Sequence, residues 1–170
     1  MKSHSNIEDF YRYPNSIEMN KLSITIALGC DHAGFKLKES LKKYLLENAE
    51  NKYEVKDFGA YSEEKADYTY FAHQVATAVE RNEFNFGLLM CGSGNGINMT
   101  ANKHKGIRAA LSWNAEIAKL SRLHNNANIL TLPARFIDLN EAKACLDIFF
   151  TTAFEGGRHA ERVNKISEGC

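Results

Sequence analysis

Short apolar runs alternate with amphipathic stretches from residue 22 to the end of the chain. The runs are rich in β-branched and aliphatic residues, which is typical of buried strands. They predict strands at 22–28, 53–58, 84–90, 107–111 and 127–132. Apolar residues spaced three and four positions apart predict helices at 35–48, 68–79, 114–124 and 139–152, a short helix beginning with INMTANK (97–103), and a last helix from about Gly157. Asp67 is placed to cap the helix that starts at Tyr68.

Strands that alternate with helices predict an α/β fold, in which a five-stranded parallel sheet carries helices on both faces. In such folds ligands collect beside the carboxyl ends of the strands. The loops to inspect are therefore GCDHAG (29–34), CGSGNG (91–96), the turn at 112–113 and LPAR (132–135).

Composition narrows the class of protein. Of the 170 residues 44% are hydrophobic, and 21 basic residues balance 21 acidic ones. This fits one globular domain over 22–170 and lacks the basic bias of proteins that bind nucleic acid or membrane surfaces. Residues 1–21 are polar and lack the apolar region of a signal peptide, so we expect a flexible arm. Four cysteines without a CxxC pair favour reduced thiols in the cytoplasm.

Cys91 stands at the mouth of a loop with glycine at 92, 94 and 96. Its functional interpretation is a base, a nucleophile or a metal ligand; the alternative is a small buried hydrophobe. No histidine or cysteine lies nearby at metal-ligand spacing, which argues against a metal site. The loop matches neither the Walker motif nor GxGxxG, and it is either a tight turn or an anion hole of N–H groups. A thiolate base beside an oxyanion hole suits proton abstraction next to a carbonyl.

Other candidates have plain structural alternatives. Asp31 and His32 follow the first strand, where Asp31 can also cap a helix and His32 can face solvent. His124 ends a helix and either reaches a cleft or interacts with the helix dipole. Arg158 and Arg162 are one helical turn apart, which suits either an anion clamp or a solvated basic face. Three further histidines are interpreted as surface residues: His4, His73 and His104.

Six motifs carry a resemblance to a known family: GCDHAGFKLK (29–38), DYTYFAHQVA (67–76), CGSGNG (91–96), ANKHKGIRAA (101–110), SRLHNNANIL (121–130) and EGGRHAERV (155–163). Together they resemble the type B ribose-5-phosphate isomerases, whose wider family includes galactose-6-phosphate isomerase subunits. The resemblance implies a Rossmann-like three-layer sandwich. It also implies interconversion of D-ribose 5-phosphate and D-ribulose 5-phosphate through a cis-enediolate, in the non-oxidative pentose phosphate pathway. No metal or cofactor is expected, and a homodimer is expected to share its active sites between subunits.

The resemblance assigns roles to particular positions. Cys91 matches the base and His124 the residue that opens the sugar ring. The N–H groups of the glycine loop match the oxyanion hole: Gly92, Ser93, Gly94, Asn95 and Gly96. Substrate and phosphate contacts are expected at Asp31, His32, Tyr68, Asn125, Arg135, Arg158 and Arg162.

At two positions, members of the family differ from this chain. One branch of the family has a glutamate base where this chain has Ile97, which assigns the chain to the cysteine branch. Thr69 replaces a proline found in many members and is expected to loosen the start of its helix. Three alternatives stay open: an isomerase of galactose 6-phosphate or allose 6-phosphate, a non-catalytic sugar-phosphate sensor, and a flavodoxin-like electron carrier. Whether dimers pair into tetramers also stays open.

Overall fold

The computed structural model describes residues 23–48 and 53–168, and the predicted arm at 1–21 lies outside the described residues. The strands are β1 (Ile24–Cys30), β2 (Tyr53–Asp57), β3 (Phe86–Cys91), β4 (Ala109–Leu111) and β5 (Ile129–Pro133). The helices are α2 (Phe35–Glu47), α3 (Tyr68–Glu80), α4 (Asn95–Ala101), α5 (Ala115–Asn125), α6 (Leu139–Thr151) and α7 (Arg158–Lys165). Every predicted element is therefore present, with bounds that shift by at most two residues.

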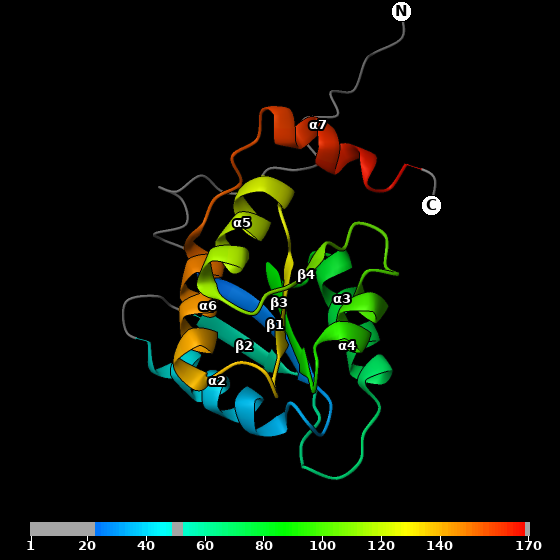
Figure 1. Cartoon of the computed structure of the whole chain (residues 1–170). Helices are drawn as coiled ribbons and strands as arrows, with labels where there is room; N and C mark the ends of the chain where they lie inside the picture. Colours follow the sequence, from blue (N-terminus) through cyan, green and yellow to red (C-terminus); the bar gives the residue numbers. More distant parts are fainter. Residues whose placement is uncertain (1–22, 49–52, 169–170) are drawn as a thin grey trace, which may run out of the picture.

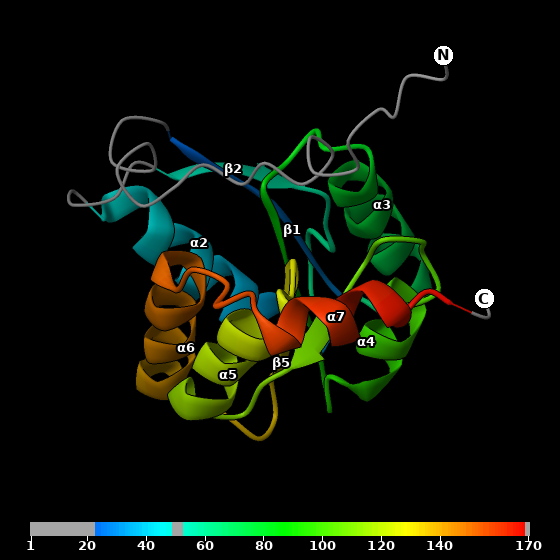
Figure 2. The same ribbon diagram turned by 90° about the horizontal axis from the view of Figure 1, so that it is seen from above.

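The five strands form one parallel sheet in the order β2-β1-β3-β5-β4. Helices α2, α5 and α6 cover one face, and α3 and α4 cover the other (Figures 1 and 2). The predicted three-layer, Rossmann-like α/β sandwich is confirmed. Within the described residues, no helix has both the length and the apolar composition needed to cross a bilayer.

Alternate residues of the strands fill two core regions. Leu88 and Met90 of β3 pack with α2, α5 and α6, whereas Leu89 and Cys91 pack with α3 and α4. All six residues of β3 are buried, because helices cover the sheet on both sides. This explains why β3 is a continuous apolar run rather than an alternating one.

Side-chain caps fix the starts of three helices. Asp67, Asn114 and Asp138 each accept a hydrogen bond from a backbone N–H two or three residues further on. The predicted cap at Asp67 is confirmed. Thr69 donates both its backbone N–H, at 2.9 Å, and its hydroxyl, at 2.8 Å, to the Asp67 carboxylate. The hydroxyl of Thr69 thus adds a second bond to the cap, which acts against the expected loosening of this helix start.

The two ends of the sheet carry different features. Helix α2 follows β1 on one face and α4 follows β3 on the other, so the loops after these neighbouring strands diverge. Such a switch point is where ligands bind in open α/β sheets. At the opposite end of the sheet, α7 lies beside the C-terminal end of α5 (Figure 1).

Lys38 of α2 is a fully buried cation. Its ammonium lies 2.5 Å from the Asp57 carboxylate, and the Lys42 ammonium lies 2.7 Å from the same group. Burial acts to raise the pKa of Asp57, but the hydrogen bonds from both lysines outweigh it, and the pKa falls below its ordinary 3.8. Because the pKa of Asp57 is lower in the folded than in the unfolded protein, its ionised carboxylate stabilises the fold at any pH above the unfolded-state pKa. This stabilisation is lost as the pH falls through the folded-state pKa.

Replacing Lys38 with methionine is expected to lower the free energy of unfolding by about 3 kcal/mol, at the low end for a broken buried pair because Lys42 remains. Urea unfolding at pH 7 measures this change. Lys43→Met is the matched control, since Lys43 faces Glu47 across 3.9 Å at the exposed side of the helix. It should cost less than about 0.5 kcal/mol. Equal losses of unfolding free energy in the two variants would contradict the prediction. The difference between Lys38→Met and Lys43→Met should shrink below about pH 4, where Asp57 becomes protonated.

Candidate active site

Cys91 ends β3 at the switch point, in register with Pro133 of β5. The Met90 carbonyl accepts the backbone N–H of Asp31 at 3.2 Å, so Asp31 and Cys91 lie next to each other at this edge. The Cys91 side chain is 4% exposed and packs with the core beneath α3 and α4. Its burial agrees with the packing interpretation, and its place at the loop mouth agrees with the functional one.

The glycine loop after Cys91 presents its backbone. Gly94 has a φ of +76°, in the left-handed region that favours glycine, and it precedes α4 without a side-chain cap. A Cβ at Gly94 would also collide with Leu111. Among the described residues, the N–H groups of Gly92, Ser93 and Gly94 find no acceptor in the protein. These donors are therefore available to an anion.

Tyr68 and Arg135 frame the loop. A Cβ at Gly96 would lie 2.6 Å from Cζ of Tyr68, so only glycine lets the ring rest on the loop. The N–H of Arg135 donates to the Gly92 carbonyl at 3.0 Å, and a Cβ at Gly92 would lie 3.4 Å from the guanidinium carbon. Both predicted contact residues thus lie beside the glycines.

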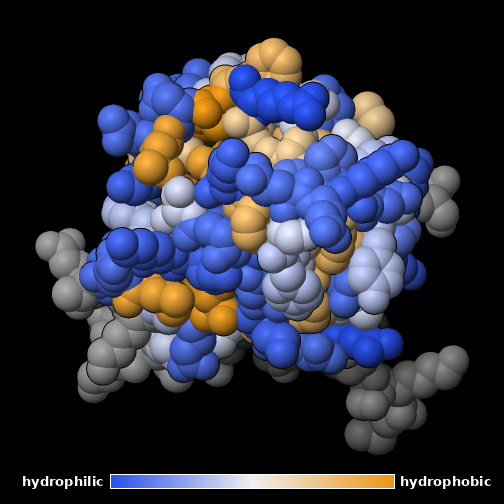
Figure 3. Space-filling view, turned by 90° about the horizontal axis from the view of Figure 1, so that it is seen from below, coloured by the Kyte–Doolittle hydropathy of each residue, from blue (hydrophilic) through white to orange (hydrophobic). Residues whose placement is uncertain are grey.

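Asp31 and His32 complete this side of the site. The Asp31 carboxylate accepts the Gly34 N–H at 2.9 Å, which closes the turn before α2 and agrees with the structural alternative. Nδ1 of His32 lies 3.2 Å from the Ala66 carbonyl oxygen, so the ring is anchored to the loop before α3. We call this group the loop cluster: Asp31, His32, Tyr68, Cys91–Gly96 and Arg135. Figure 3 looks onto this end of the molecule, where polar residues surround smaller hydrophobic patches.

The other described cysteines are packing residues. Burial raises the pKa of Cys30 to about 12 and that of Cys145 to about 12. Neither supplies a thiolate near neutral pH. Cys30 also faces the core with α2 and α6, on the side of the sheet opposite Cys91. Cys91 is therefore the candidate thiol among the described residues.

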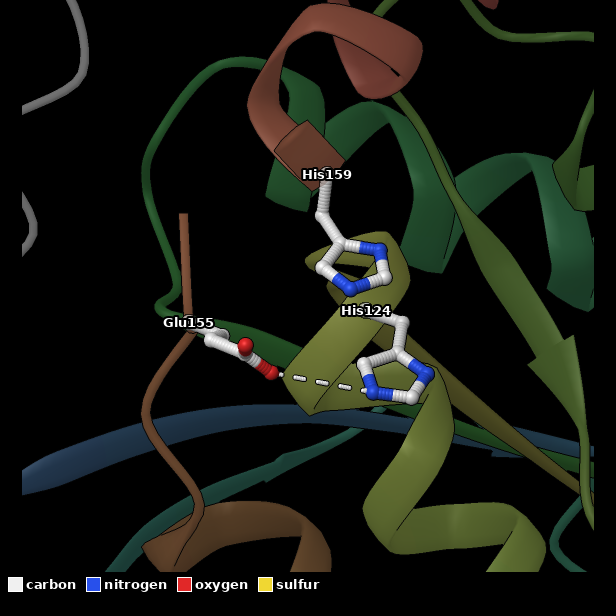
Figure 4. Close-up of side chains that lie close together, drawn as sticks. All are labelled: His124, Glu155 and His159. Atoms are coloured by element: carbon white, nitrogen blue, oxygen red, sulfur yellow. Dashed lines mark ion pairs between the residues drawn. The ribbon is translucent and has the colours of Figure 1, made fainter. Parts of the chain in front are cut away.

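A second group gathers at the end of α5. His124 stacks on His159, with ring centroids 4.2 Å apart and planes inclined by 5°. Nε2 of His124 lies 3.7 Å from the Glu155 carboxylate, and Figure 4 shows the three side chains converging. Burial, together with the neighbouring His124, lowers the pKa of His159, which favours the neutral form of this ring. We call this group the helix-end cluster: His124, Asn125, Glu155, Arg158, His159 and Arg162.

Within one chain the two clusters lie at opposite ends of the sheet. Cys91 is level with the last residue of β5, Pro133, whereas His124 precedes the first, Ile129. Those four steps along the strand alone span about 13 Å. The structure brings the predicted loop residues together, but it separates them from His124, Asn125, Arg158 and Arg162.

Sequence reasoning missed several neighbours. His159 and Glu155 were not singled out, although EGGRH contains both. His73 is exposed, as predicted for a surface residue, and His104 is half-buried; their contact was missed, because their ring nitrogens lie 2.8 Å apart. The other nitrogen of His104 lies 3.3 Å from the Glu80 carboxylate. No local pattern links residues so far apart in the chain; His4 lies outside the described residues.

The parallel α/β sheet with a thiol and a bare glycine loop at its switch point defines a site for a small anionic substrate. Comparison with known proteins narrows this class. The profile of the Ribose/Galactose Isomerase family matches residues 26–166. The chain belongs to this family, and within it to the type B ribose-5-phosphate isomerases.

Three relatives illustrate the similarity. Ribose-5-phosphate isomerase B of Escherichia coli is 44% identical over 142 residues, which cover 84% of this chain and 93% of that protein. The crystal structure of the enzyme from Thermotoga maritima is 48% identical, with a TM-score of 0.82 over 85% of this chain and 98% of that one. The enzyme from Mycoplasma genitalium with bound ribulose-5-phosphate is 40% identical, with a TM-score of 0.79 over 85% and 95% of the two chains.

Proposed function

We propose that the protein interconverts D-ribose 5-phosphate and D-ribulose 5-phosphate through a cis-enediolate, in the cytoplasm and within the non-oxidative pentose phosphate pathway. The observation that carries this proposal is Cys91 at the mouth of a glycine loop with free N–H groups, at the switch point of the sheet. The relative from Mycoplasma genitalium, which was solved with ribulose-5-phosphate, supports the choice of substrate.

In this mechanism the Cys91 thiolate acts as the general base. It takes the proton from C2 of the open-chain aldose, the electron pair forms the C1–C2 double bond, and negative charge collects on O1. The N–H groups of Gly92, Ser93 and Gly94 stabilise that charge. The thiol then returns the proton to C1 while the O2 proton moves to O1, which leaves a carbonyl at C2. Base and oxyanion hole adjoin because they act on adjacent atoms of one substrate.

A second subunit completes the site. His124 opens the sugar ring, but within one chain it lies at the other end of the sheet from Cys91. We therefore assign His124 and Asn125 to the active site of the neighbouring subunit in a homodimer. Each dimer then has two active sites, and each site combines one loop cluster with the partner's helix-end cluster.

Arg158 and Arg162 bind the substrate phosphate in this arrangement. Both are exposed on α7, Arg158 at its first position and Arg162 one helical turn further on, where a phosphate can accept bonds from both guanidinium groups. Arg135 and His32 provide further polar groups from the loop cluster, and Asp31 and Tyr68 line the sugar.

Arg158→Ala is expected to raise KM for ribose 5-phosphate about tenfold or more while changing kcat less, because the phosphate contact is the same in substrate and transition state. Steady-state kinetics measure both constants. Lys165→Ala removes a positive charge from the same helix and serves as the matched control, with KM close to that of the wild type. A KM unchanged in Arg158→Ala would contradict the phosphate role.

The direct test is ketose formation from D-ribose 5-phosphate with EDTA present. Turnover under these conditions supports a metal-independent isomerase. Galactose 6-phosphate and allose 6-phosphate are assayed beside it, since the family name covers galactose isomerases. Turnover of a six-carbon sugar alone would replace the proposed substrate, and binding without turnover of any of them would favour a sensor.

A further inference from the structure

Three side chains in the helix-end cluster bring possible metal ligands close together. His124, Glu155 and His159 each offer one ligand atom, and these atoms all lie within 4.8 Å of one another. Figure 4 shows them arriving from α5, from the segment before α7 and from α7 itself. The three side chains are set by tertiary packing rather than by the spacing of one helix, so they form a three-dimensional site.

His159 supplies an independent observation that points to a ligand. Its side chain is 7% exposed, and Nε2 has no hydrogen-bond partner among the described residues. A buried nitrogen without a hydrogen-bond partner is unfavourable, so such groups are rare unless something binds them. In Figure 4 this nitrogen points toward His124 and Glu155.

We propose that His124, Glu155 and His159 form a binding site for a divalent transition metal ion, with Zn²⁺ as the best-matched ion. Two imidazole nitrogens and one carboxylate oxygen are a recurring three-residue zinc set, which leaves a fourth position for water. Imidazole donors favour zinc and its neighbours over Mg²⁺ and Ca²⁺, which take oxygen ligands.

To bind one ion, His124 must turn out of its stack on His159, because the nitrogen lone pairs of two parallel rings do not meet at one point. Bonds of about 2.0–2.2 Å in a tetrahedral site place donor atoms about 3.3 Å apart. Glu155 is 53% exposed and His124 is 36% exposed, so both side chains can turn toward the buried His159. The metal site therefore forms when the exposed side chains of His124 and Glu155 rotate toward His159, which stays in place.

Some charges near the site favour a bound cation and others oppose it. The Glu155 carboxylate can offset part of the charge of a bound cation, and its Oε2 lies 3.7 Å from Nε2 of His124. Arg158 and Arg162 oppose a cation, but both are exposed on α7, where solvent and salt screen their charges. The donor set therefore remains favourable for a bound ion.

Metal binding has a consequence for catalysis, which rests on the proposed function. A Zn²⁺ ion on His124 occupies the nitrogen lone pair needed for proton transfer during ring opening. The ion is therefore an inhibitor of the isomerase and not its cofactor. Chelation releases His124 and restores activity.

Zinc binding is measured on the full chain by competition against a fluorescent zinc chelator, independently of activity. The wild type should take one Zn²⁺ per chain, and Glu155→Gln and His159→Asn should each weaken binding at least tenfold. Glu155 is exposed, so its variant keeps the test valid even where His159→Asn fails to fold. His104→Asn is the matched control, because it removes the separate pair with His73 and should bind as the wild type does.

Co²⁺ serves as a second probe, because its visible spectrum distinguishes nitrogen and oxygen ligands from thiolate. A spectrum with thiolate ligands, loss of binding in His104→Asn only, or no Zn²⁺ binding by the wild type would each overturn the site. In the activity assay, Zn²⁺ should inhibit the wild type and EDTA should reverse this. Inactive wild type that still binds Zn²⁺ would refute the proposed function and leave the site standing. Binding without inhibition would refute the link to His124.

Discussion

Replacing Cys91 with alanine is expected to lower kcat for ribose 5-phosphate isomerisation by about 10²–10⁴-fold, the usual contribution of a general base. Affinity for the sugar phosphate should change little, because the thiol acts on the C–H bond while the loop N–H groups and the arginines hold the ligand. Steady-state kinetics give kcat, and calorimetry gives the affinity.

Cys145→Ala is the matched control for this variant. Cys145 is also a buried thiol, but it lies on α6 in the core on the other face of the sheet. Its loss removes a similar side-chain volume without touching the glycine loop, so kcat should stay near the wild-type value. Unchanged turnover in Cys91→Ala would exclude the thiol as the base. A parallel fall in both variants would indicate a general loss of stability.

The sequence predicts the layers of this fold because its signals are local. Parallel strands buried on both faces appear as continuous apolar runs, and β3 is the clearest case. The strand predicted at 107–111 shortens to Ala109–Leu111, because the backbone N–H of Arg108 bonds to the Asn128 side chain instead of the sheet. Helix α4 starts at Asn95, two residues earlier than predicted, since Gly94 makes the turn before it.

Long-range pairings have no such local signal. The insertion of β5 between β3 and β4 depends on how the crossovers pack, and no pattern in either strand encodes it. The stack of His124 on His159 joins residues 35 positions apart by number, and a lone histidine at a helix end looks like a cap in the sequence. Most of the loop cluster was predictable because Asp31, the glycine loop and Arg135 follow strands, and carboxyl ends of parallel strands meet at one edge. Tyr68 begins α3 instead and was expected from the family resemblance alone.

Separation of the two clusters within one chain leads to a prediction about mixed dimers. Cys91→Ala damages the loop cluster, and His124→Asn damages the helix-end cluster, so in the proposed arrangement a homodimer of either variant has two defective sites. In a heterodimer of the two variants, one site receives both defects and the other receives none. Heterodimers purified through two different affinity tags should therefore regain about half of the wild-type activity.

In the control heterodimer, Cys91→Ser takes the place of His124→Asn and is paired with Cys91→Ala through the same two tags. Both changes fall in the loop cluster, so every site of that heterodimer keeps a defect and activity should stay low. Native mass spectrometry verifies that each preparation contains one copy of each variant. Verified Cys91→Ala and His124→Asn heterodimers without recovered activity would contradict the shared site. Because the two residues lie at opposite ends of the sheet in one chain, His124 would then have no route to the substrate held by Cys91, and its role in ring opening would fall as well.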